Sequence, residues 1–332
     1  MNLFRSFLFM MSAPFLLFTA CHDGQADAEK VVADSLVNVS DSLKSDSDVL
    51  VLALTPTVDC LPVYYAAQSG IFKTLGLKVN LLTFRSQFDC DTAMLGQTAM
   101  GGATDLVRLH HYANEGKYLS AVTTTDGIWR LLVSGKLRIK KTALLKDRMI
   151  CVARFSASDI YSKAALDAAG MEYKDVFRPQ VNDYGLRGFM LKNNQIDAAI
   201  LPEPFATQAR LEGHRVLYTT TDKNGKMGCL AFKPSFLTGT DSLHRVELLL
   251  KGYNQAVGEL NEKGKSACAG ILKDLYRMPM QVIDSLALPK YGKAALPEAV
   301  DLAKARSFME MHNRWNRQAK NDSLINGKFL PK

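Results

Sequence analysis

Short apolar runs alternate with amphipathic segments through the first part of the chain. The run from Asp48 to Leu54 is mostly apolar and ends at Thr-Pro, which predicts a buried strand. A helix is expected next, with Pro62 in its first turn and Gly70 at its end. The cycle continues with strands at 77–84, 99–102 and 119–123, a short helix after Asp91-Thr92 and a helix from Asp105 to Glu115. Strands that alternate with helices predict a parallel α/β sheet, whose ligands collect beyond the carboxyl ends of the strands.

A second unit of the same kind is expected beyond Trp129–Val133, where the chain crosses over. Its predicted elements are a strand at 149–153, a helix at 156–170, a strand at 178–181, a helix that ends near 194 and a strand at 198–201. A turn signal at 222–225 ends this unit, and the strand 228–232 crosses back. The remainder, 235–332, has mainly helical spacing. A body of this length is near the size at which one core splits into two, so we expect two lobes.

The first 21 residues differ from the rest of the chain. They carry one early charge, Arg5, and then a run rich in Phe, Leu and Met. The run is short for a membrane span, but its length and the small residues before Cys21 suit a secretory signal. Leu17–Cys21 resembles the lipobox of bacterial lipoproteins. We therefore expect residues 1–21 to be a lipoprotein signal peptide and Cys21 to carry lipid, which would hold the exported protein on the periplasmic side of a bacterial membrane. A plain signal peptide is the alternative.

Residues 22–48 hold seven acids against two lysines and contain no aromatic residue. Such a segment buries too little apolar surface to offset the entropy of ordering it, which predicts a disordered acidic tether. The formal net charge of the whole chain is +8, so the folded body beyond the tether is basic. That excess favours an anionic ligand or an acidic surface only weakly. Basic stripes interleaved with aromatic residues are missing from the sequence, which argues against nucleic acid as a partner.

Three stretches resemble a known family, in the same order along the chain. Leu61–Lys73, followed by Leu75–Val79, is similar to the opening of the binding proteins of ABC importers for nitrate, sulfonates, taurine and thiamine precursors. Asn194–Ala199 and Glu203–Ala206 resemble the family's Gly-Gln-Val-Asp-Ala and Glu-Pro-Phe-Ala. The run Leu286–Leu296 is the third match.

This resemblance implies a type II periplasmic-binding-protein fold, in which two α/β lobes are joined by two crossover strands. Lobe one would comprise residues 49–133 and 227–332, and lobe two residues 134–226. It also implies an extracytoplasmic solute-binding protein that captures a small polar solute between the lobes. The partners would be an ABC permease and its ATPase. No cofactor is implied.

Turns at the carboxyl ends of strands supply the ligand contacts in a cleft between two such lobes. The candidate ligand-binding residues that follow from the strand prediction are Thr55, Thr57, Asp59, Tyr64, Arg85, Ser86, Gln87, Thr104, Asp105, Thr124, Asp126, Arg154, Ser156, Ser158, Asn182, Asp183, Tyr184 and Glu203. Each has a structural alternative: Ser158, Asp105 and Asp183 also suit helix caps, and Tyr64 suits packing on a neighbouring helix.

The sign of the ligand stays open. A helix that begins near Ser156 would offer free backbone N–H groups and hydroxyls to a carboxylate, sulfonate or phosphate, with Arg154 and Arg85 as complements. Against this, Asp59, Asp105, Asp126 and Glu203 suit a cationic or amine-bearing ligand. Trp129 stands at the crossover, where it either lines the cleft or fills the hinge.

Beyond Cys21 the chain has five cysteines with no Cys-x-x-Cys spacing, which argues against a zinc ribbon or a thioredoxin-type centre. Cys60 and Cys90 each follow a predicted strand, and these two strands are expected to be neighbours. Two interpretations stand side by side: a Cys60–Cys90 disulfide, which export permits, or two free thiols. A metal held by Asp59, Cys60, Asp89 and Cys90 is a distant third.

The sequence lacks the motifs of common enzymes. It contains no Gly-x-Ser-x-Gly elbow and no Gly-x-x-x-x-Gly-Lys loop. His110 and His111 are adjacent, so on a helix they would point about 100° apart and would not share a metal ion. We therefore expect a binding protein with no catalytic or metal site. An enzyme of the thiamine-precursor type and a sensory solute-binding protein are the alternatives.

Overall fold

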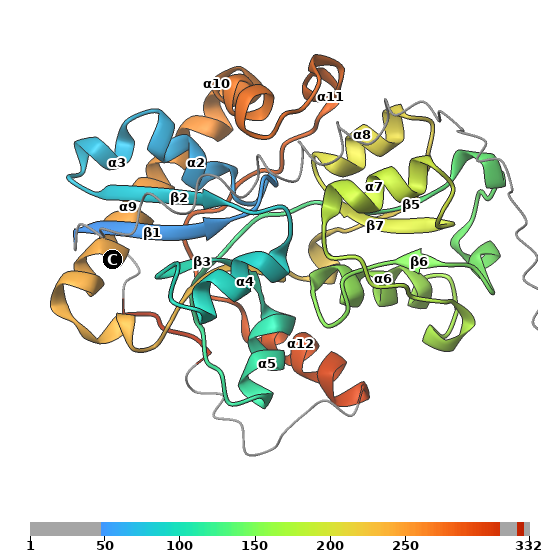
Figure 1. The fold of residues 1–332 in the computed structure, drawn as a ribbon, viewed down its shortest axis with the longest axis horizontal. Coiled ribbons are helices and arrows are strands. Elements are labelled where there is room, and N and C mark those ends of the chain that lie inside the picture. The colour runs from blue at the N-terminus through green and yellow to red at the C-terminus, as the bar shows by residue number, and fades with distance from the viewer. Residues whose placement is uncertain (1–47, 313–323, 329–332) are drawn as a thin grey trace, which may run out of the picture. The chain divides into compact units, whose positions relative to one another are not determined.

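The described part of the chain, residues 48–312 and 324–328 of a computed structural model, contains two β-sheets (Figure 1). The predicted signal peptide, Cys21 and nearly all of the predicted tether lie outside the described residues. The two sheets and the helices on them give the mixed α/β architecture of the expected two-lobed, type II periplasmic-binding fold.

The first sheet has the strand order β2-β1-β3-β9-β4. Its strands are β1 (Val49–Leu54), β2 (Lys78–Thr83), β3 (Gly101–Asp105), β4 (Ser120–Thr124) and β9 (Gly228–Phe232). β1 runs parallel to β2 and β3, whereas β9 is antiparallel to β3 and β4. β1 and β3 approach closely at Gly102, where an added Cβ would lie 2.1 Å from the carbonyl oxygen of Ala53. Only glycine fits that position without a shift of the backbone.

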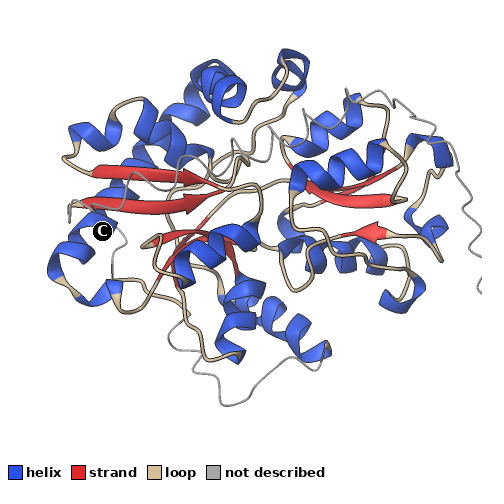
Figure 2. Cartoon of the chain, in the orientation of Figure 1, coloured by secondary structure: helices blue, strands red, loops and turns tan. Residues whose placement is uncertain are grey.

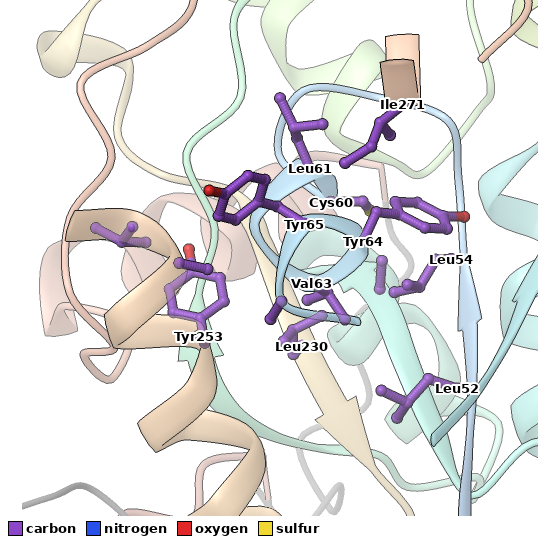
Figure 3. Close-up of a cluster of buried hydrophobic side chains, with 14 of the residues drawn as sticks. Leu52, Leu54, Cys60, Leu61, Val63, Tyr64, Tyr65, Leu230, Tyr253 and Ile271 are labelled. Atoms are coloured by element: carbon purple, nitrogen blue, oxygen red, sulfur yellow. The ribbon is translucent and has the colours of Figure 1, made fainter. Parts of the chain in front are cut away.

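Helices cover both faces of this sheet (Figure 2). One face carries α2 (Leu61–Gln68), α3 (Ile71–Thr74) and α9 (Thr240–Lys263), and the other carries α4 (Gln87–Leu95), α5 (Leu106–Asn114) and α12 (Ala299–Met311). β1 alternates between the two cores: Leu50, Leu52 and Leu54 join the first cluster, and Ala53 joins the second. Figure 3 shows part of the first cluster, where side chains of α2 meet strands and Tyr253 of α9.

The second sheet has the order β6-β7-β5-β8. Its strands are β5 (Trp129–Val133), β6 (Ile150–Cys151), β7 (Ala198–Pro202) and β8 (Arg215–Thr219). α6 (Ala157–Asp167) packs on one face, and α7 (Tyr184–Lys192) and α8 (Phe205–Leu211) pack on the other. The remaining helical segments are α10 (Lys265–Gly270), α11 (Met280–Ser285), a π turn η6 (Ile271–Leu275) and the 3₁₀ turns η1 (Gly135–Leu137), η2 (Thr142–Leu145), η3 (Tyr173–Asp175), η4 (Asp222–Asn224) and η5 (Phe236–Thr238).

The structure corrects three details of the predicted elements. Trp129–Val133, expected at the end of lobe one, pairs with β7 and β8 and therefore belongs to the second sheet. The predicted strand 178–181 is reduced to two isolated bridges, Met149–Phe177 and Val152–Gln180. β8 was not predicted, because its sequence, Arg-Val-Leu-Tyr-Thr, follows a Gly-His turn without clear alternation.

The chain passes between the sheets twice, through short irregular segments in place of the two expected crossover strands. The first segment joins β4 to β5 over residues 125–128, and the second joins β8 to β9 over residues 220–227. They are hydrogen-bonded together: the N–H of Thr125 donates to the Gly228 carbonyl at 2.9 Å, and the N–H of Thr220 donates to the Trp129 carbonyl at 2.9 Å. We call this paired connection the hinge, after the role that the family resemblance implies for it. Among the described residues no helix is both long and apolar enough to cross a membrane.

Candidate functional site

A cavity of about 490 Å³ lies where residues of both sheets and both connecting segments meet. It falls in the size range of small-molecule sites. Nine of the predicted ligand-binding residues line it: Thr57, Asp59, Gln87, Thr104, Asp105, Asp126, Ser156, Ser158 and Tyr184. They come from the turn after β1, from the end of β3, from the starts of α4, α6 and α7, and from the first connecting segment. We call this cavity the cleft.

Asp59 reaches the cleft from the loop after β1. Its Oδ2 accepts a hydrogen bond from Thr125 Oγ1 at 3.5 Å, and Gly228 leaves room for that hydroxyl, since an added Cβ there would lie 2.5 Å from Thr125 Oγ1. Within the described ranges no lysine, arginine or histidine forms an ion pair with Asp59. Burial raises the pKa of this carboxyl, although hydrogen bonds from Thr57, from its own backbone N–H and from Thr125 oppose the rise. Asp59 thus presents to the cleft a carboxyl that is hydrogen-bonded but has no cationic partner among the described residues.

Two tyrosines from the C-terminal part of the chain hold the loop that carries Asp59. Tyr276 donates its hydroxyl to the carbonyl of Thr57, and Tyr291 donates to the carbonyl of Val58, both at 2.8 Å. Both side chains are buried. The loop after the first strand is therefore fixed by residues more than 200 positions later in the chain.

Asp105, at the end of β3, lies in a buried charged network. One carboxylate oxygen caps α5 by accepting from the N–H of Arg108 at 3.0 Å, and the other lies 3.8 Å from Nε of Arg108. Arg108 also pairs with Asp91 at 3.0 Å. Burial raises the pKa of Asp105 to about 6, although the charge of Arg108 and the backbone N–H of Ala157 oppose the rise. The Ala157 bond joins the first sheet's loop to the start of α6.

The start of α6 brings Ser156 and Ser158 to the cleft, and both hydroxyls are engaged in their own turn. Ser156 accepts from the N–H of Ser158 at 3.2 Å and donates to the Ala153 carbonyl at 2.7 Å. Ser158 accepts from the N–H of Ala153 at 2.9 Å. Arg154, the predicted complement of an anion here, is exposed and does not line the cleft. The predicted anion site is thus not assembled in this arrangement.

Aromatic side chains form another part of the lining. Trp129 packs against Tyr184 and Tyr161, with ring centroids 5.9 and 6.0 Å apart. Trp129 therefore lines the cleft, one of the two positions expected for it. Tyr161 lies on α6 and was not predicted, since a tyrosine inside an amphipathic helix gives no signal that separates lining from core.

Arg187 of α7 was also missed, although it lines the cleft and is 0% exposed. Its guanidinium donates to three carbonyls: Val181 at 2.7 Å, Ile200 at 2.7 Å and Asn182 at 3.4 Å. Burial lowers its pKa. The sequence signal that could have identified it is a single arginine in a run of otherwise apolar or small residues, Gly185–Leu191.

The hinge contains an ion pair, and a third segment of the chain, around Gly292, is bound to it. Asp126 pairs with Lys226 across the two connecting segments at 2.5 Å and accepts from the N–H of Gly292 at 2.7 Å. Lys226 and the neighbouring Lys290 line the cleft. The segment around Gly292 belongs to the third stretch of the family resemblance.

The other nine predicted ligand-binding residues lie outside the cleft lining, and most have a structural role there. They are Thr55, Tyr64, Arg85, Ser86, Thr124, Arg154, Asn182, Asp183 and Glu203. Tyr64 is buried in the first core and bonds to Thr83 at 2.9 Å. Ser86 and Asp183 cap α4 and α7. Glu203 is 0% exposed and pairs with Arg130 at 2.7 Å.

Arg85 and Asp183 meet at 2.7 Å, although they follow strands of different halves of the chain. Arg85 comes after β2 of the first sheet, and Asp183 begins α7 of the second. Arg85 is 66% exposed, so solvent reaches this pair. The pair forms a link between the lobes outside the cleft lining, and so does the N–H of Val58, which donates to the Glu203 carbonyl at 3.0 Å.

Cys60 and Cys90 are both free thiols, and both are 0% exposed. Cys60 precedes α2 in the first core, and Cys90 lies within α4 in the second. Burial raises the pKa of Cys90, and the nearby Cys60 acts in the same direction. In the part of the chain that the structure describes, no group of three or more metal-ligating side chains is present.

A family model described as NMT1/THI5 like matches residues 57–257. Two similar solved structures are the alkanesulfonate-binding protein SsuA from Xanthomonas axonopodis pv. citri bound to MOPS (16% identity, 84% of this chain and 96% of that chain, TM-score 0.70) and the nitrate-binding protein NrtA from Synechocystis PCC 6803 (15%, 83% and 84%, 0.65). A third is the zinc-bound ligand-binding component of an ABC-type import system from Staphylococcus aureus (13%, 85% and 97%, 0.71). None of the curated protein sequences matches the chain.

Proposed function

The chain belongs to the NMT1/THI5-like family, and from that premise we propose that it is the solute-binding component of an ABC-type importer. The observation that carries the proposal is the cleft, which is lined by polar and aromatic side chains from both lobes and from the hinge. The fold shared with a sulfonate-binding, a nitrate-binding and an ABC-import protein supports it.

The solute that suits this cleft is small and polar and places a hydrogen-bond donor, such as an amine, toward Asp59. Asp59 is a half-buried acid without an ion-pair partner in the described ranges. Of the three cations in the lining, Lys226 pairs with Asp126 and Arg187 donates to backbone carbonyls, whereas Lys290 is exposed. Asp105 lies at the same face. The expected anionic solute is less well supported, because Arg154 and Arg85 stand outside the lining and the serines at the α6 start bond within their own turn.

Capture of the solute would bring the lobes together about the hinge. The two connecting segments are joined by backbone hydrogen bonds at both ends, which limits the motion to rotation about that pair. Asp105 with Ala157 and Arg85 with Asp183 would serve as contacts of the closed form. The closed form would then dock on the permease and its ATPase.

Lipid on Cys21 would anchor the protein to the outer side of the membrane that holds the permease. The apolar run before Cys21 and the acidic segment after it support this arrangement. Radiolabelled palmitate should enter the wild-type protein and not Cys21→Ser. Equal labelling of the two would remove the anchor and leave the binding function untouched.

Native mass spectrometry of the freshly purified protein tests the main proposal. A solute of defined mass should be retained at one molecule per chain, and X-ray scattering should show a smaller radius of gyration when it is added back to stripped protein. The solute should be recovered chemically unchanged. Its conversion to a product would instead identify an enzyme, and a scattering curve indifferent to the solute would contradict capture by lobe closure.

A further inference from the structure

A second cavity lies in the second lobe, at the end of its sheet that is remote from the cleft. Ser134 follows the last residue of β5 and Arg215 is the first residue of β8, and both line this cavity. Trp129 and Thr220, at the opposite ends of the same strands, line the cleft. The cavity has a volume of about 360 Å³. We call it the basic pocket, and its lining includes Gly135, Arg138, Arg210, Gly213, His214 and Arg215.

Three arginines from three different elements converge on the basic pocket. Arg138 follows the turn η1, Arg210 lies in the last turn of α8, and Arg215 opens β8. Across residues 48–312 and 324–328, no carboxylate forms an ion pair with any of them. The nearest acid in sequence, Glu212, pairs with Lys192 at 3.1 Å. Arg210 also complements the negative end of the α8 dipole, so the charge argument rests chiefly on Arg138 and Arg215.

His214 gives the pocket a buried donor. It is 8% exposed, and its Nδ1 lies 3.3 Å from the N–H of Gly135, from which it accepts a hydrogen bond. An Nδ1 that accepts leaves the proton of the neutral ring on Nε2. Nε2 is buried and has no hydrogen-bond partner in the described part of the chain. Burial also lowers the pKa of His214, so the ring stays neutral at pH 7 and Nε2–H still donates.

Glycines build the pocket by letting two loops approach. A Cβ added at Gly135 would lie 2.3 Å from the carbonyl oxygen of Gly213, and Gly213 itself has a φ of +92°, which favours glycine. The turn after β5 is thereby held against the turn before β8. Buried donors need partners, and unpaired guanidiniums that converge favour an acceptor of opposite charge with several oxygens.

We propose that the basic pocket binds an oxyanion of the phosphate type, which accepts from Nε2–H of His214 and from the guanidiniums of Arg138 and Arg215. Arginine forks match the geometry of a phosphate group, and a neutral histidine donor adds a bond without adding charge. The phosphate group has two sources, a free phosphate or phosphate ester and the headgroup of an anionic lipid. The site lies apart from the cleft, so it does not depend on the proposed transport function.

Titration with inorganic phosphate against chloride at matched ionic strength, followed by calorimetry, tests the site. Wild type should bind phosphate saturably, and the double variant R138A/R215A should bind at least about tenfold more weakly. The matched control K136A/K140A removes the same amount of charge from the exposed segment that carries Arg138, without touching the lining, and should stay within about twofold of wild type. An equal loss in both double variants would overturn the proposal.

Two variants of His214 separate a ligand role from a packing role. His214→Gln keeps an N–H donor and should retain phosphate binding, whereas His214→Phe keeps the ring and should lose it. Circular dichroism confirms that each variant is folded. If His214→Gln and His214→Phe bind phosphate equally well, the buried donor takes no part and the proposal fails.

Co-sedimentation with vesicles distinguishes the two sources of the phosphate group. Vesicles that contain phosphatidylglycerol, compared with vesicles of phosphatidylcholine alone, should retain wild type and release R138A/R215A if the lipid headgroup is the ligand. Saturable binding of inorganic phosphate without vesicle binding assigns the site to a free anion. Binding to neither probe would overturn the proposal.

Discussion

On the first-lobe side of the cleft, Asp59 is half-buried without a cationic partner in the described ranges, and desolvation raises the pKa of both Asp59 and Asp105. On the second-lobe side, Ser156 and Ser158 form hydrogen bonds within their own turn, and Arg187 donates hydrogen bonds to three backbone carbonyls. One wall of the cleft therefore has open bonding capacity, whereas the other is internally satisfied.

This difference indicates a division of work between the lobes. A wall whose carboxyl lacks a cationic partner gains most from a ligand, and under the proposed function it would select the solute. A wall whose polar groups are already bonded is rigid and provides a preformed surface against which the solute is closed. The predictions below test the satisfied wall first and the open wall next, and end with the contacts between the two.

Arg187→Met should have the largest effect, and it should fall on stability. The substitution removes the donor to three carbonyls, one of them buried, and is expected to lower the free energy of unfolding by about 3 kcal/mol, measured by urea denaturation. Arg154→Met, an exposed arginine before α6, is the matched control and should change stability by less than about 0.5 kcal/mol. If both variants unfold at the same urea concentration, Arg187 is not the support of the second wall.

Asp59→Asn should weaken retention of the cleft solute by about tenfold, because a charge-assisted hydrogen bond becomes a neutral one. Stability should be unchanged or slightly higher, since a desolvated carboxylate is removed. Occupancy by native mass spectrometry measures the first effect and thermal unfolding the second. Asp167→Asn, on the exposed face of α6, should alter neither. Stronger retention in Asp59→Asn would indicate an anionic solute and reverse the comparison.

Asp105 should make stability depend on pH in the mildly acidic range. Its folded-state pKa of about 6 lies above the ordinary 3.8, so its contribution to stability is present below the ordinary value and is lost as the pH rises through about 6. Asp105→Asn keeps a cap for α5 but cannot titrate. The difference between the wild-type and variant unfolding free energies should therefore change between pH 4 and 6 and be flat above about 7. A constant difference over that range would contradict a raised pKa.

Arg85→Ala should have the smallest effect on stability, less than about 1 kcal/mol, since the Arg85–Asp183 pair is largely exposed. Its effect should fall on lobe closure: the solute-free protein should have a larger radius of gyration at low salt. Lys117→Ala, which breaks an exposed ion pair with Glu115 within the first lobe, is the control and should leave the scattering unchanged.

The sequence predicted the fold well, because strong apolar runs and turn residues coincide with real elements. β1, α2 and β9 lie where the pattern placed them. The errors arose where tertiary contacts decide: Trp129–Val133 reads as a strand in any context, and only pairing with β7 and β8 assigns it to the second sheet. The segment 178–181 contains Pro179, which has no N–H to donate to a ladder, and it forms only one isolated bridge, between Gln180 and Val152.

Half of the candidate ligand-binding residues line the cleft, and the direction of the side chains explains why the other half do not. The rule that ligands contact turns after strands found Asp59 and Asp105 but also included Thr55 and Glu203, which follow strands and turn into the interior. Residues on helices and in the hinge, such as Arg187, Tyr161 and Lys226, follow no such rule. The basic pocket exists only once the chain is folded, because its three arginines come from different elements: Arg138, Arg210 and Arg215.

The hydrogen bonds from the hydroxyls of Tyr276 and Tyr291 to the loop after β1 have a consequence for biosynthesis. A ribosome makes the Asp59 loop early and the two tyrosines that fasten it last, more than 200 residues later. A nascent chain that ends before Tyr276 contains every strand of both sheets and still lacks the clamps of its main ligand loop. If Asp59 contacts the solute as proposed, its loop is fastened only when translation is almost complete, and an unfinished chain would bind the solute poorly.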